Sequence, residues 1–449
     1  MALTKIKKGL DLPISGEPVQ KIDGSKDPKK VAVIGYDYVG MKPTMLVQVG
    51  DTVKLGQVLF TDKKMPAVKY TAPGAGKVIE INRGEKRVFE SLVIELSGSE
   101  EETFESYSEK QLENLTPEQV KSNLIESGLW TTIRRRPFGK VADPEASPKS
   151  IFITAMDTNP LAPDMKVILK GQENDFRNGL VVLSHLTQGK VHLCKNPDLS
   201  FDTSGLEKVR TQEFTGKHPA GNAGTHIHFI DPVDSKHFVW HVDLQDVIAI
   251  GKLFTTGKIS VERIVALGGP VVNNPRLLKT RIGADLSEFL AGELKEGDNR
   301  IISGSVLSGR KADGPLLYLG RFHQQVSVVE EGRQREFLGW LSPGFNLFSV
   351  KKILASALTP SKKFAFSTAL NGGPRAIVPV GSYEQVMPLD IIPTYLLRAI
   401  AVDDIEEGEK LGMLELVEED LALCTYVCPS KIDHGANLRR NLTIIEKEG

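Results

Sequence analysis

Short apolar runs separated by turns fill the first part of the sequence. Up to about residue 98, six β-branched runs alternate with Gly, Pro or Asp turns at an even spacing, a pattern typical of a small barrel or sandwich. The predicted strands are Val31 to Ile34, Thr44 to Val49, Gln57 to Phe60, Val68 to Tyr70, Lys77 to Ile81 and Ser91 to Leu96. We therefore expect an all-β module over residues 1–98.

An acidic stretch follows the predicted strands. Five glutamates lie among Ser and Thr between Ser99 and Glu109, and such a like-charged stretch cannot bury itself. Residues 99–115 are therefore predicted to be a linker. Thr116, Pro117 and Gln119 then provide an N-cap hydroxyl, a proline at the first helical position and a capping-box partner. We expect a helix from there to Ser127 that ends at Gly128.

The pattern from Ser150 onward alternates between strand and helix. Ile151 to Met156 is a predicted buried strand, and Val191 to Cys194 is a second one. Between them Phe176, Leu180 and Leu183 recur at helical spacing. Residues 116–258 are therefore predicted to form an α/β domain with a parallel sheet.

Two further modules are expected after residue 258. In residues 259–335, Gly-rich turns break short strands such as Arg263 to Leu267 around one helical stretch, Leu286 to Leu290, which favours a small β-sheet with one helix. Residues 336–449 are predicted to be mostly helical. The evidence for those helices is Val350, Leu354 and Leu358 on one face, Thr394 before Tyr395 to Ile400, and a last helix near Ala436 to Glu446.

Composition excludes several classes of partner. The chain has 449 residues, 56 Lys plus Arg and 57 Asp plus Glu, so it lacks the positive charge that nucleic-acid binding requires. No apolar run approaches the ~18–20 residues that cross a bilayer, and Met1 to Asp11 has no continuous apolar core of the kind that a signal peptide needs. Three cysteines rule out a disulfide framework. We expect a soluble, multidomain chain in the cytoplasm.

Histidines are concentrated in one window. Seven of nine lie between His185 and His241, and a strand at His226-Ile227-His228 would point two imidazoles to one face, while His237 and His241 would align on a helix. Such an arrangement could hold zinc. However, the window contains Asp231 and Asp234 only in a Pro-containing turn, and its one cysteine is Cys194. We predict no metal site.

Cationic and aromatic residues alternate after Gly128. The constellation consists of Trp130, Arg134, Arg135, Arg136, Phe138 and Lys140. A quinone headgroup needs donors to two carbonyl oxygens and flat apolar walls, and this set supplies both. Alternatively the segment is a basic docking surface for a partner or for anionic lipid, or a plain solvated face. Under either interpretation Arg135 and Arg136 are expected to be exposed.

Two segments of the first module resemble a known fold. Val49 to Phe60 (VGDTVKLGQVLF) and Thr71 to Ile81 (TAPGAGKVIEI) are similar to the two halves of a barrel-sandwich hybrid, as in lipoyl and biotinyl domains. In such carriers a lysine at a hairpin tip is modified, and Lys63 or Lys64 lies near that position. The segment before Ala72 is longer than in a carrier, so an unmodified structural barrel is predicted.

The whole chain, from Lys5–Pro13 (KIKKGLDLP) to the C-terminal cysteine segment, resembles the NqrA family of subunits of the sodium-translocating NADH:quinone reductase. After the linker it is more distantly similar to the flavin-carrying subunit of respiratory complex I and to the C subunit of the Rnf complex. The resemblance implies a Rossmann-like domain over 116–258 and a β-grasp domain of the soluble-ligand-binding (SLBB) type over 259–335. Val271 to Pro275 and Arg281 to Gly283 are similar to the start of that module.

Against these relatives, the chain has lost its cofactor motifs. The glycine-rich loop that approaches a flavin phosphate in the relatives corresponds here to Gly128 to Gly139, which is filled by side chains. The acidic stretch after the next strand has become Asp157-Thr158-Asn159-Pro160. Of a four-cysteine iron–sulfur motif, only Cys424 and Cys428 remain, because Glu418 and Leu421 occupy the first two positions. The two cysteines are predicted to be vestigial, buried small side chains.

The resemblance implies a function at the level of a complex. We expect a peripheral subunit on the cytoplasmic face of the bacterial inner membrane, in a complex that oxidises NADH, reduces ubiquinone and exports Na⁺. No cofactor is predicted to bind this chain, and no complete active site is expected within it. Flavins and metal centres belong to integral membrane subunits, the expected partners. Ubiquinone is a possible ligand, and the alternative function is a cofactor-free structural scaffold that organises the complex.

Overall fold

The computed structural model describes residues 3–333 and 339–448. Its first module contains two small antiparallel sheets. One orders β3 (Lys30–Ile34), β9 (Phe89–Leu96), β8 (Gly76–Arg83) and β5 (Thr52–Val53), and the other orders β4 (Pro43–Met45), β6 (Val58–Asp62) and β7 (Lys69–Thr71). Phe60 stacks on Tyr70 at 4.7 Å and meets the edge of Phe89 at 5.2 Å, which fills the space between the sheets. The predicted barrel-sandwich hybrid is thus confirmed.

The largest sheet belongs to the α/β module. It orders β1 (Leu3–Ile6), β14 (Val209–Gly216), β13 (Val191–Lys195), β12 (Ile151–Ala155), β15 (Val239–Asp243), β10 (Arg134–Arg136) and β11 (Lys140–Val141). The first five strands are parallel to their neighbours, as predicted, while β10 and β11 add an antiparallel edge. The N-terminal strand β1 therefore lies in the sheet of the second module, which local sequence does not reveal.

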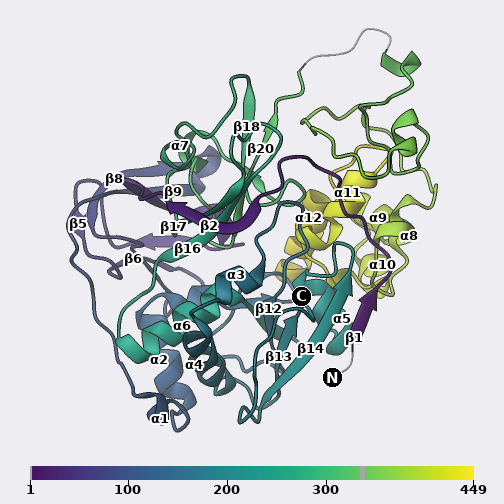
Figure 1. Ribbon diagram of the computed structural model, residues 1–449. Coiled ribbons are helices and arrows are strands. Elements are labelled where there is room, and N and C mark those ends of the chain that lie inside the picture. Colours follow the sequence, from purple (N-terminus) through teal and green to yellow (C-terminus); the bar gives the residue numbers. More distant parts are fainter. Residues whose placement is uncertain (1–2, 334–338, 449) are drawn as a thin grey trace.

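Helices cover both faces of this sheet (Figure 1). Ile151 and Ile153 share one core with α4 (Glu173–Ser184) and α6 (Leu244–Thr256), whereas Phe152 packs on the opposite face with α5 (Ala223–Ile230). The helix α2 (Pro117–Glu126) begins with the predicted Thr116–Gln119 capping box and ends before Gly128, whose φ is 77°. Short helices α1 (Glu109–Leu112), inside the predicted linker, and α3 (Met165–Leu169) complete the module.

The third module is a six-stranded sheet with one short helix. Its strand order is β19 (Arg310–Lys311), β18 (Asn299–Ser303), β20 (Gln325–Glu330), β16 (Glu262–Gly268), β17 (Arg276–Arg281) and β2 (Val19–Ser25), and α7 (Leu286–Phe289) covers it. This agrees with the predicted sheet and single helix. The edge strand β2 is another contribution from the N-terminal segment, so residues 3–25 connect three modules.

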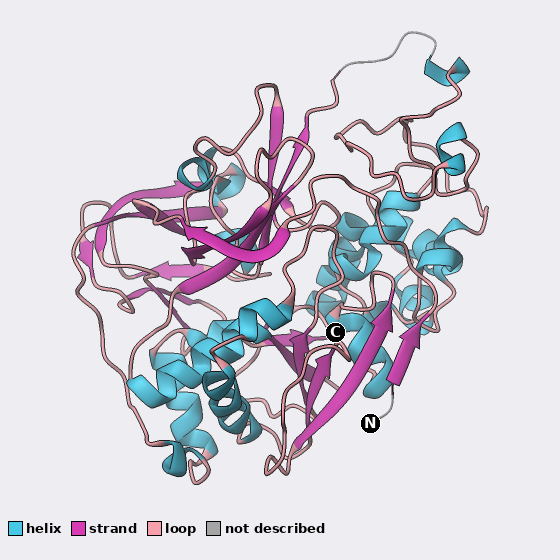
Figure 2. Cartoon of the chain, in the orientation of Figure 1, coloured by secondary structure: helices cyan, strands magenta, loops and turns pink. Residues whose placement is uncertain are grey.

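The C-terminal module is helical only in its second half. Figure 2 shows its helices grouped below long loops: α8 (Ser382–Val386), α9 (Pro393–Ala401), α10 (Ile405–Lys410), α11 (Ala422–Val427) and α12 (His434–Glu448). The helical face predicted at Val350, Leu354 and Leu358 is wrong. That stretch is irregular except for one 3₁₀ turn, Ala355–Leu358, and Leu358 is 81% exposed, so no core stabilises a helix there.

The predicted histidine geometry is also wrong. His226 and His228 lie on α5 rather than on a strand, and His241 lies on β15 rather than on a helix. His226 is fully buried, whereas His228 contacts Glu415 at 2.7 Å. Over the described residues, no group of three or more His, Cys, Asp or Glu side chains is placed to hold a metal ion.

Candidate functional site

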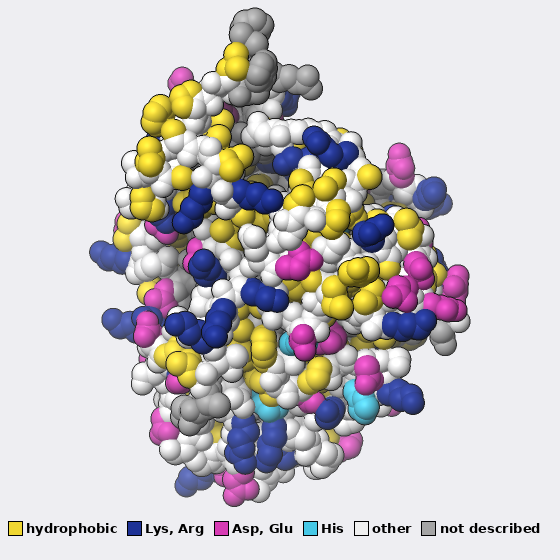
Figure 3. All heavy atoms as spheres, turned by 90° about the vertical axis from the view of Figure 1, so that its right-hand side faces the viewer, with side chains coloured by type: hydrophobic (Ala, Val, Ile, Leu, Met, Phe, Trp, Pro, Cys, Tyr) yellow, Lys and Arg dark blue, Asp and Glu magenta, His cyan; other side chains and the backbone are white. Residues whose placement is uncertain are grey.

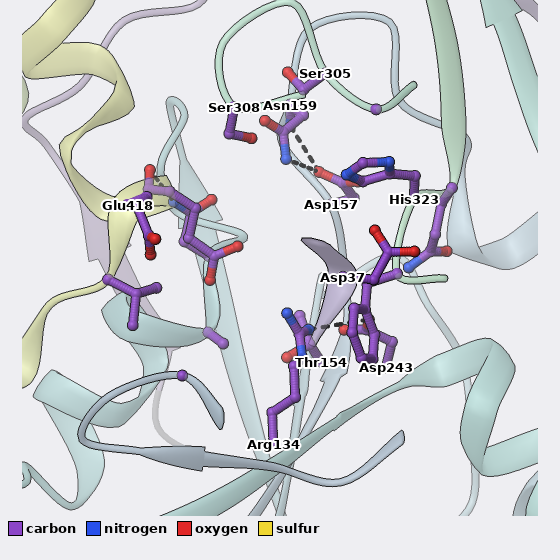
Figure 4. Close-up of a pocket in the computed structure, with 18 of the residues that line it drawn as sticks. Asp37, Arg134, Thr154, Asp157, Asn159, Asp243, Ser305, Ser308, His323 and Glu418 are labelled. Carbon is purple, nitrogen blue, oxygen red and sulfur yellow. Dashed lines mark hydrogen bonds and ion pairs between the residues drawn. The ribbon is translucent and has the colours of Figure 1, made fainter. Parts of the chain in front are cut away.

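A cavity of about 530 Å³ lies at the carboxyl ends of β12 and β15. The chain runs from β12 to β13 on one side and later returns to β15 on the other side, and ligands of open α/β sheets bind at such a switch point. The other three modules close the cavity, through Tyr36 and Asp37, the segments around Ser305 and Phe322, and the segment around Glu418. Figure 4 shows side chains from all of them pointing into one space.

Arg134 on β10 lines this cavity (Figure 4). Its guanidinium pairs with Asp243 at 3.3 Å and lies over the Phe322 ring at 4.4 Å. Thr154, the last residue but one of β12, lies beside them (Figure 4). Burial raises the pKa of Asp243, although Arg134 partly opposes the shift. Neither the Arg134 Nε nor the Thr154 hydroxyl has a hydrogen-bond partner within the described parts of the chain, although both atoms are buried.

A second cation projects from the third module. Arg310 donates to Asp37 at 2.7 Å, and its Nε and Nη2 find no acceptor among residues 3–333 and 339–448. Beside it, the His323 Nδ1 lies 2.8 Å from the Ser303 hydroxyl. Burial lowers the pKa of His323 to about 4, so this imidazole is neutral at pH 7. This side of the cavity therefore presents the unpaired Arg310 donors beside the uncharged His323 ring.

The C-terminal module is joined to the opposite wall by ion pairs. Arg136 is fully buried and donates to Asp420 at 2.7 Å and to Glu419 at 2.8 Å. Burial alone would lower the pKa of Arg136, but the two carboxylates raise it. Arg439 on α12 pairs with Glu418 and donates to the Phe138 carbonyl at 2.7 Å. These contacts fix the C-terminal module against β10.

The residues of the predicted cationic and aromatic set do not all line the same space, because side chains alternate between the two faces of β10. Successive strand residues point to opposite faces; Arg134 and Arg136 line the central cavity, whereas Arg135 lies over the Phe238 ring at 4.4 Å. Arg135, Phe138 and Lys140 line a second cleft of about 260 Å³ against the first module. Lys140 there pairs with Glu446.

The predicted exposure of this segment is wrong. Arg136 is fully buried because β10 is covered by the C-terminal module, and Arg135 is only partly exposed. Trp130 is fully buried, donates to the Ala142 carbonyl at 2.8 Å and meets Trp240 edge to face at 5.4 Å. Trp130 thus lines neither space, and the segment is not a solvated face.

Several cavity residues are missed by the sequence patterns. Asp37, Arg310 and His323 come from modules distant along the chain, and no local motif marks them. Thr154 and Asp243 carry a usable signal, because polar residues at the ends of buried parallel strands meet at one edge of a sheet.

The net charge of the lining limits what the cavity can hold. Four arginines (134, 136, 310 and 439) face five carboxyl groups (Asp37, Asp157, Asp243, Glu418 and Glu419). Burial also raises the pKa of Asp157 and Glu419. Such a lining suits a neutral ligand with hydrogen-bond acceptors better than a phosphate, because buried carboxylates repel added negative charge.

The two cysteines that the sequence analysis predicts to be vestigial are not among the residues that line the cavity. Cys424 and Cys428 are buried in the core of the C-terminal module, as predicted. The Tyr383 hydroxyl lies 3.0 Å from the Cys428 sulfur, and Leu421 is buried in the same core. Burial raises the pKa of Cys424, which favours the neutral thiol.

Sequence comparisons agree with this architecture. Three family models match: the NqrA N-terminal barrel-sandwich hybrid domain over residues 4–97, the NqrA second alpha/beta domain over 115–259, and the NQRA C-terminal domain, of SLBB type, over 264–314. These matches define a chain of the NqrA type.

Full-length relatives identify the family. The chain is 56% identical over 447 residues to the NqrA subunit of the Na(+)-translocating NADH-quinone reductase of Hahella chejuensis, and 57% identical over 447 residues to that of Pseudomonas aeruginosa PAO1, covering 100% of both chains in each case. The NqrA subunit of Pasteurella multocida is 56% identical, covering 99% of each chain. The chain belongs to the NqrA family of Na⁺-translocating NADH-quinone reductase subunits.

Proposed function

We propose that this chain is the peripheral subunit of a membrane complex that oxidises NADH, reduces ubiquinone and exports Na⁺, and that it binds the quinone headgroup in the central cavity. It would lie on the cytoplasmic face of the bacterial inner membrane, attached to integral membrane subunits that hold the flavins and metal centres. In the described residues, no helix has both the length and the apolar character needed to cross a bilayer.

The unpartnered donors carry the quinone proposal. A quinone is a flat neutral ring with two carbonyl oxygens, and the buried Arg134 Nε, Thr154 hydroxyl and Arg310 guanidinium offer donors without acceptors among the described residues. Leaving such groups unpaired costs ~1–3 kcal/mol each, so a ligand that accepts from them gains affinity. Phe322 supplies an aromatic wall, already oriented by Arg134.

The same cavity suits quinone reduction. Conversion to the quinol takes two electrons and two protons; partner subunits would supply the electrons. Asp157 and Asp243 line the cavity, and burial raises the pKa of both. Carboxyl groups of this kind can hold protons near a reacting oxygen, which gives them the role of proton donors.

The proposal includes no cofactor on this chain. The segment equivalent to the flavin-phosphate loop forms a 3₁₀ turn, Leu129–Thr132, with all four residues buried. A phosphate would therefore displace packed side chains, and the carboxyl groups of the cavity would repel it. The purified chain is expected to be colourless, and a stoichiometric flavin or iron–sulfur absorbance would contradict this.

A structural scaffold is the second candidate function. The Arg136 and Arg439 ion pairs hold the C-terminal module on the α/β sheet and need no ligand to do so. Under this alternative the cavity binds nothing, and the chain only organises its partners.

Quinone titration of the isolated chain separates the two candidates. A short-chain ubiquinone should quench the fluorescence of Trp130 and Trp240, which lie beside β10. We expect Arg134→Gln and Thr154→Val to weaken binding at least tenfold, because each removes a donor worth ~1.5 kcal/mol or more.

The matched control is Arg135→Gln, on the opposite face of the same strand, which should bind within twofold of wild type. Circular dichroism and melting temperature show that each variant is folded. Wild-type affinity in both cavity variants would overturn the quinone site, and a loss confined to Arg135→Gln would move it to the second cleft. No binding by the wild-type chain favours the scaffold.

A further inference from the structure

Exposed large apolar side chains are concentrated in one segment. Among the described residues, seven such side chains are spread over residues 3–333, whereas residues 341–380 alone carry eight. They are Leu341, Phe345, Leu347, Ile353, Leu358, Leu370, Val378 and Val380. Single exposed apolar residues are normal, but a group of them marks an interaction site. We call these eight residues the C-terminal apolar surface.

The segment that carries this surface is folded onto the rest of the chain. Phe364 pairs with the N-terminal strand segment, donating to Pro13 and accepting from Ser15. Phe348, Phe364 and Phe366, in the same segment, form a ring cluster with centroids 5.8–6.3 Å apart. The apolar side chains are therefore presented by an ordered support.

The charge of the segment is one-sided. Between Leu341 and Tyr383 the sequence contains Lys351, Lys352, Lys362, Lys363 and Arg375 and no Asp or Glu. Figure 3 shows Lys and Arg side chains among hydrophobic ones over the upper part of this face. Lys363 pairs with Glu17 of the N-terminal segment at 3.1 Å, which leaves four of the five cations without a carboxylate partner among the described residues. The surface is thus apolar and cationic, in a chain whose net charge is only −1.

These features disfavour two of three possible occupants. A second copy would place the four cations that lack a carboxylate partner in the described residues against the same four, because a two-fold interface pairs a patch with itself. A lipid surface suits an amphipathic helix, whereas residues 342–380 form irregular loops with one 3₁₀ turn, Ala355–Leu358, and Leu341 ends another. Irregular backbone leaves polar groups that hydrocarbon cannot satisfy. A protein surface can pair with both the backbone and the cations.

We propose that the C-terminal apolar surface docks onto an apolar, acid-bearing surface of another protein of the same complex. The inference rests on the proposed function insofar as that assigns the chain to a membrane complex. The apolar residues would be buried in the contact, and the cations would steer association.

Retention in the complex tests this directly. The variant Ile353→Glu/Leu358→Glu places two carboxylates at positions that are 77% and 81% exposed. The complex is purified through an affinity tag on one of its membrane-spanning proteins, and the amount of this chain that co-purifies is measured. We expect at least a tenfold loss, and a smaller loss for Lys351→Glu/Lys352→Glu that grows at higher ionic strength.

The matched control is Leu46→Glu/Val49→Glu, at residues 59% and 58% exposed on the first module, which should leave retention within twofold of wild type. The isolated docking variant should keep the wild-type melting temperature and ubiquinone affinity. Those readouts separate a docking failure from a failure of the proposed quinone site.

Three outcomes would overturn the proposal. The first is wild-type retention of Ile353→Glu/Leu358→Glu in the complex. The second is loss of binding to phosphatidylglycerol vesicles with retention intact, which would assign the surface to lipid. The third is conversion of a dimer to a monomer in sedimentation with retention intact, which would assign it to a second copy.

Discussion

Replacing Arg136 tests the most buried charge in the candidate site. Its side chain is fully buried between β10 and the C-terminal module, where it pairs with Asp420, itself 2% exposed, and with Glu419. In Arg136→Ala, Asp420 loses its cation in a low-dielectric setting, whereas Glu419, whose side chain is 33% exposed, loses it nearer to solvent. Removing one partner of a buried pair costs ~3–5 kcal/mol. Asp420 keeps the Val417 amide as a donor at 3.0 Å, so we expect a cost of about 3 kcal/mol, at the lower end of that range.

Urea unfolding, followed by circular dichroism, measures this cost. Because the chain has several modules, the relevant quantity is the midpoint of the first transition, in which the C-terminal module separates. The control Arg135→Ala removes a cation that lies over the Phe238 ring and should cost ~1 kcal/mol or less.

A double variant isolates the coupling. Arg136→Met/Asp420→Asn removes both charges of the shorter pair, so its cost should be less than the sum of the costs of Arg136→Met and Asp420→Asn made singly. The reasoning is refuted if Arg136→Ala destabilises by less than about 1 kcal/mol, or no more than Arg135→Ala does.

Two further predictions concern stability. Burial lowers the pKa of His226 from 6.5 to about 4, although the hydrogen bond between its ring and the Ala220 carbonyl partly opposes the shift. The unfolded chain therefore binds the proton first, and folded-state stability should fall by up to about 3 kcal/mol as pH drops from 6.5 to 4, with no contribution above both values. Urea midpoints at pH 7.5 and 4.5 should differ less in His226→Phe. In Gly179→Ala, the new Cβ would lie 2.1 Å from the Val247 carbonyl, forcing α4 away from α6. We expect a loss of ~1–3 kcal/mol, whereas Gly373→Ala, with nothing within 4 Å, should melt like wild type.

Local sequence predicts the elements well where one short-range rule dominates. The capping box at Thr116, the buried strand at Ile151 and the α/β alternation are set by neighbouring residues. The helix expected at Val350 fails because its apolar face has no core to pack on, and periodicity alone does not supply one. Likewise His226-Ile227-His228 is too short to distinguish a strand from a helix by its periodicity. The packing of α5 against the sheet makes it helical.

The cavity could be predicted only in part, for a related reason. The sequence shows Arg134 and Arg136 as cations beside aromatic residues. It does not show that they share one face of a strand with Arg135 on the other, because β10 forms only by pairing with β15. Asp37, Arg310 and His323 join the site through contacts between modules that are far apart along the chain. Such contacts leave no periodic signal.

The three-residue strand β10 links the cavity to the C-terminal module. Through Arg134, β10 presents a cation to the cavity at the switch point between β12 and β15. Through Arg136, the same strand binds the C-terminal module. The C-terminal module also carries the C-terminal apolar surface, on loops that are anchored to the N-terminal segment at Phe364. A partner seated on that surface would therefore act on the module that Arg136 holds against the cavity. Loss of Arg136 should then weaken both the cavity wall and retention in the complex, whereas loss of Arg134 should affect quinone binding alone.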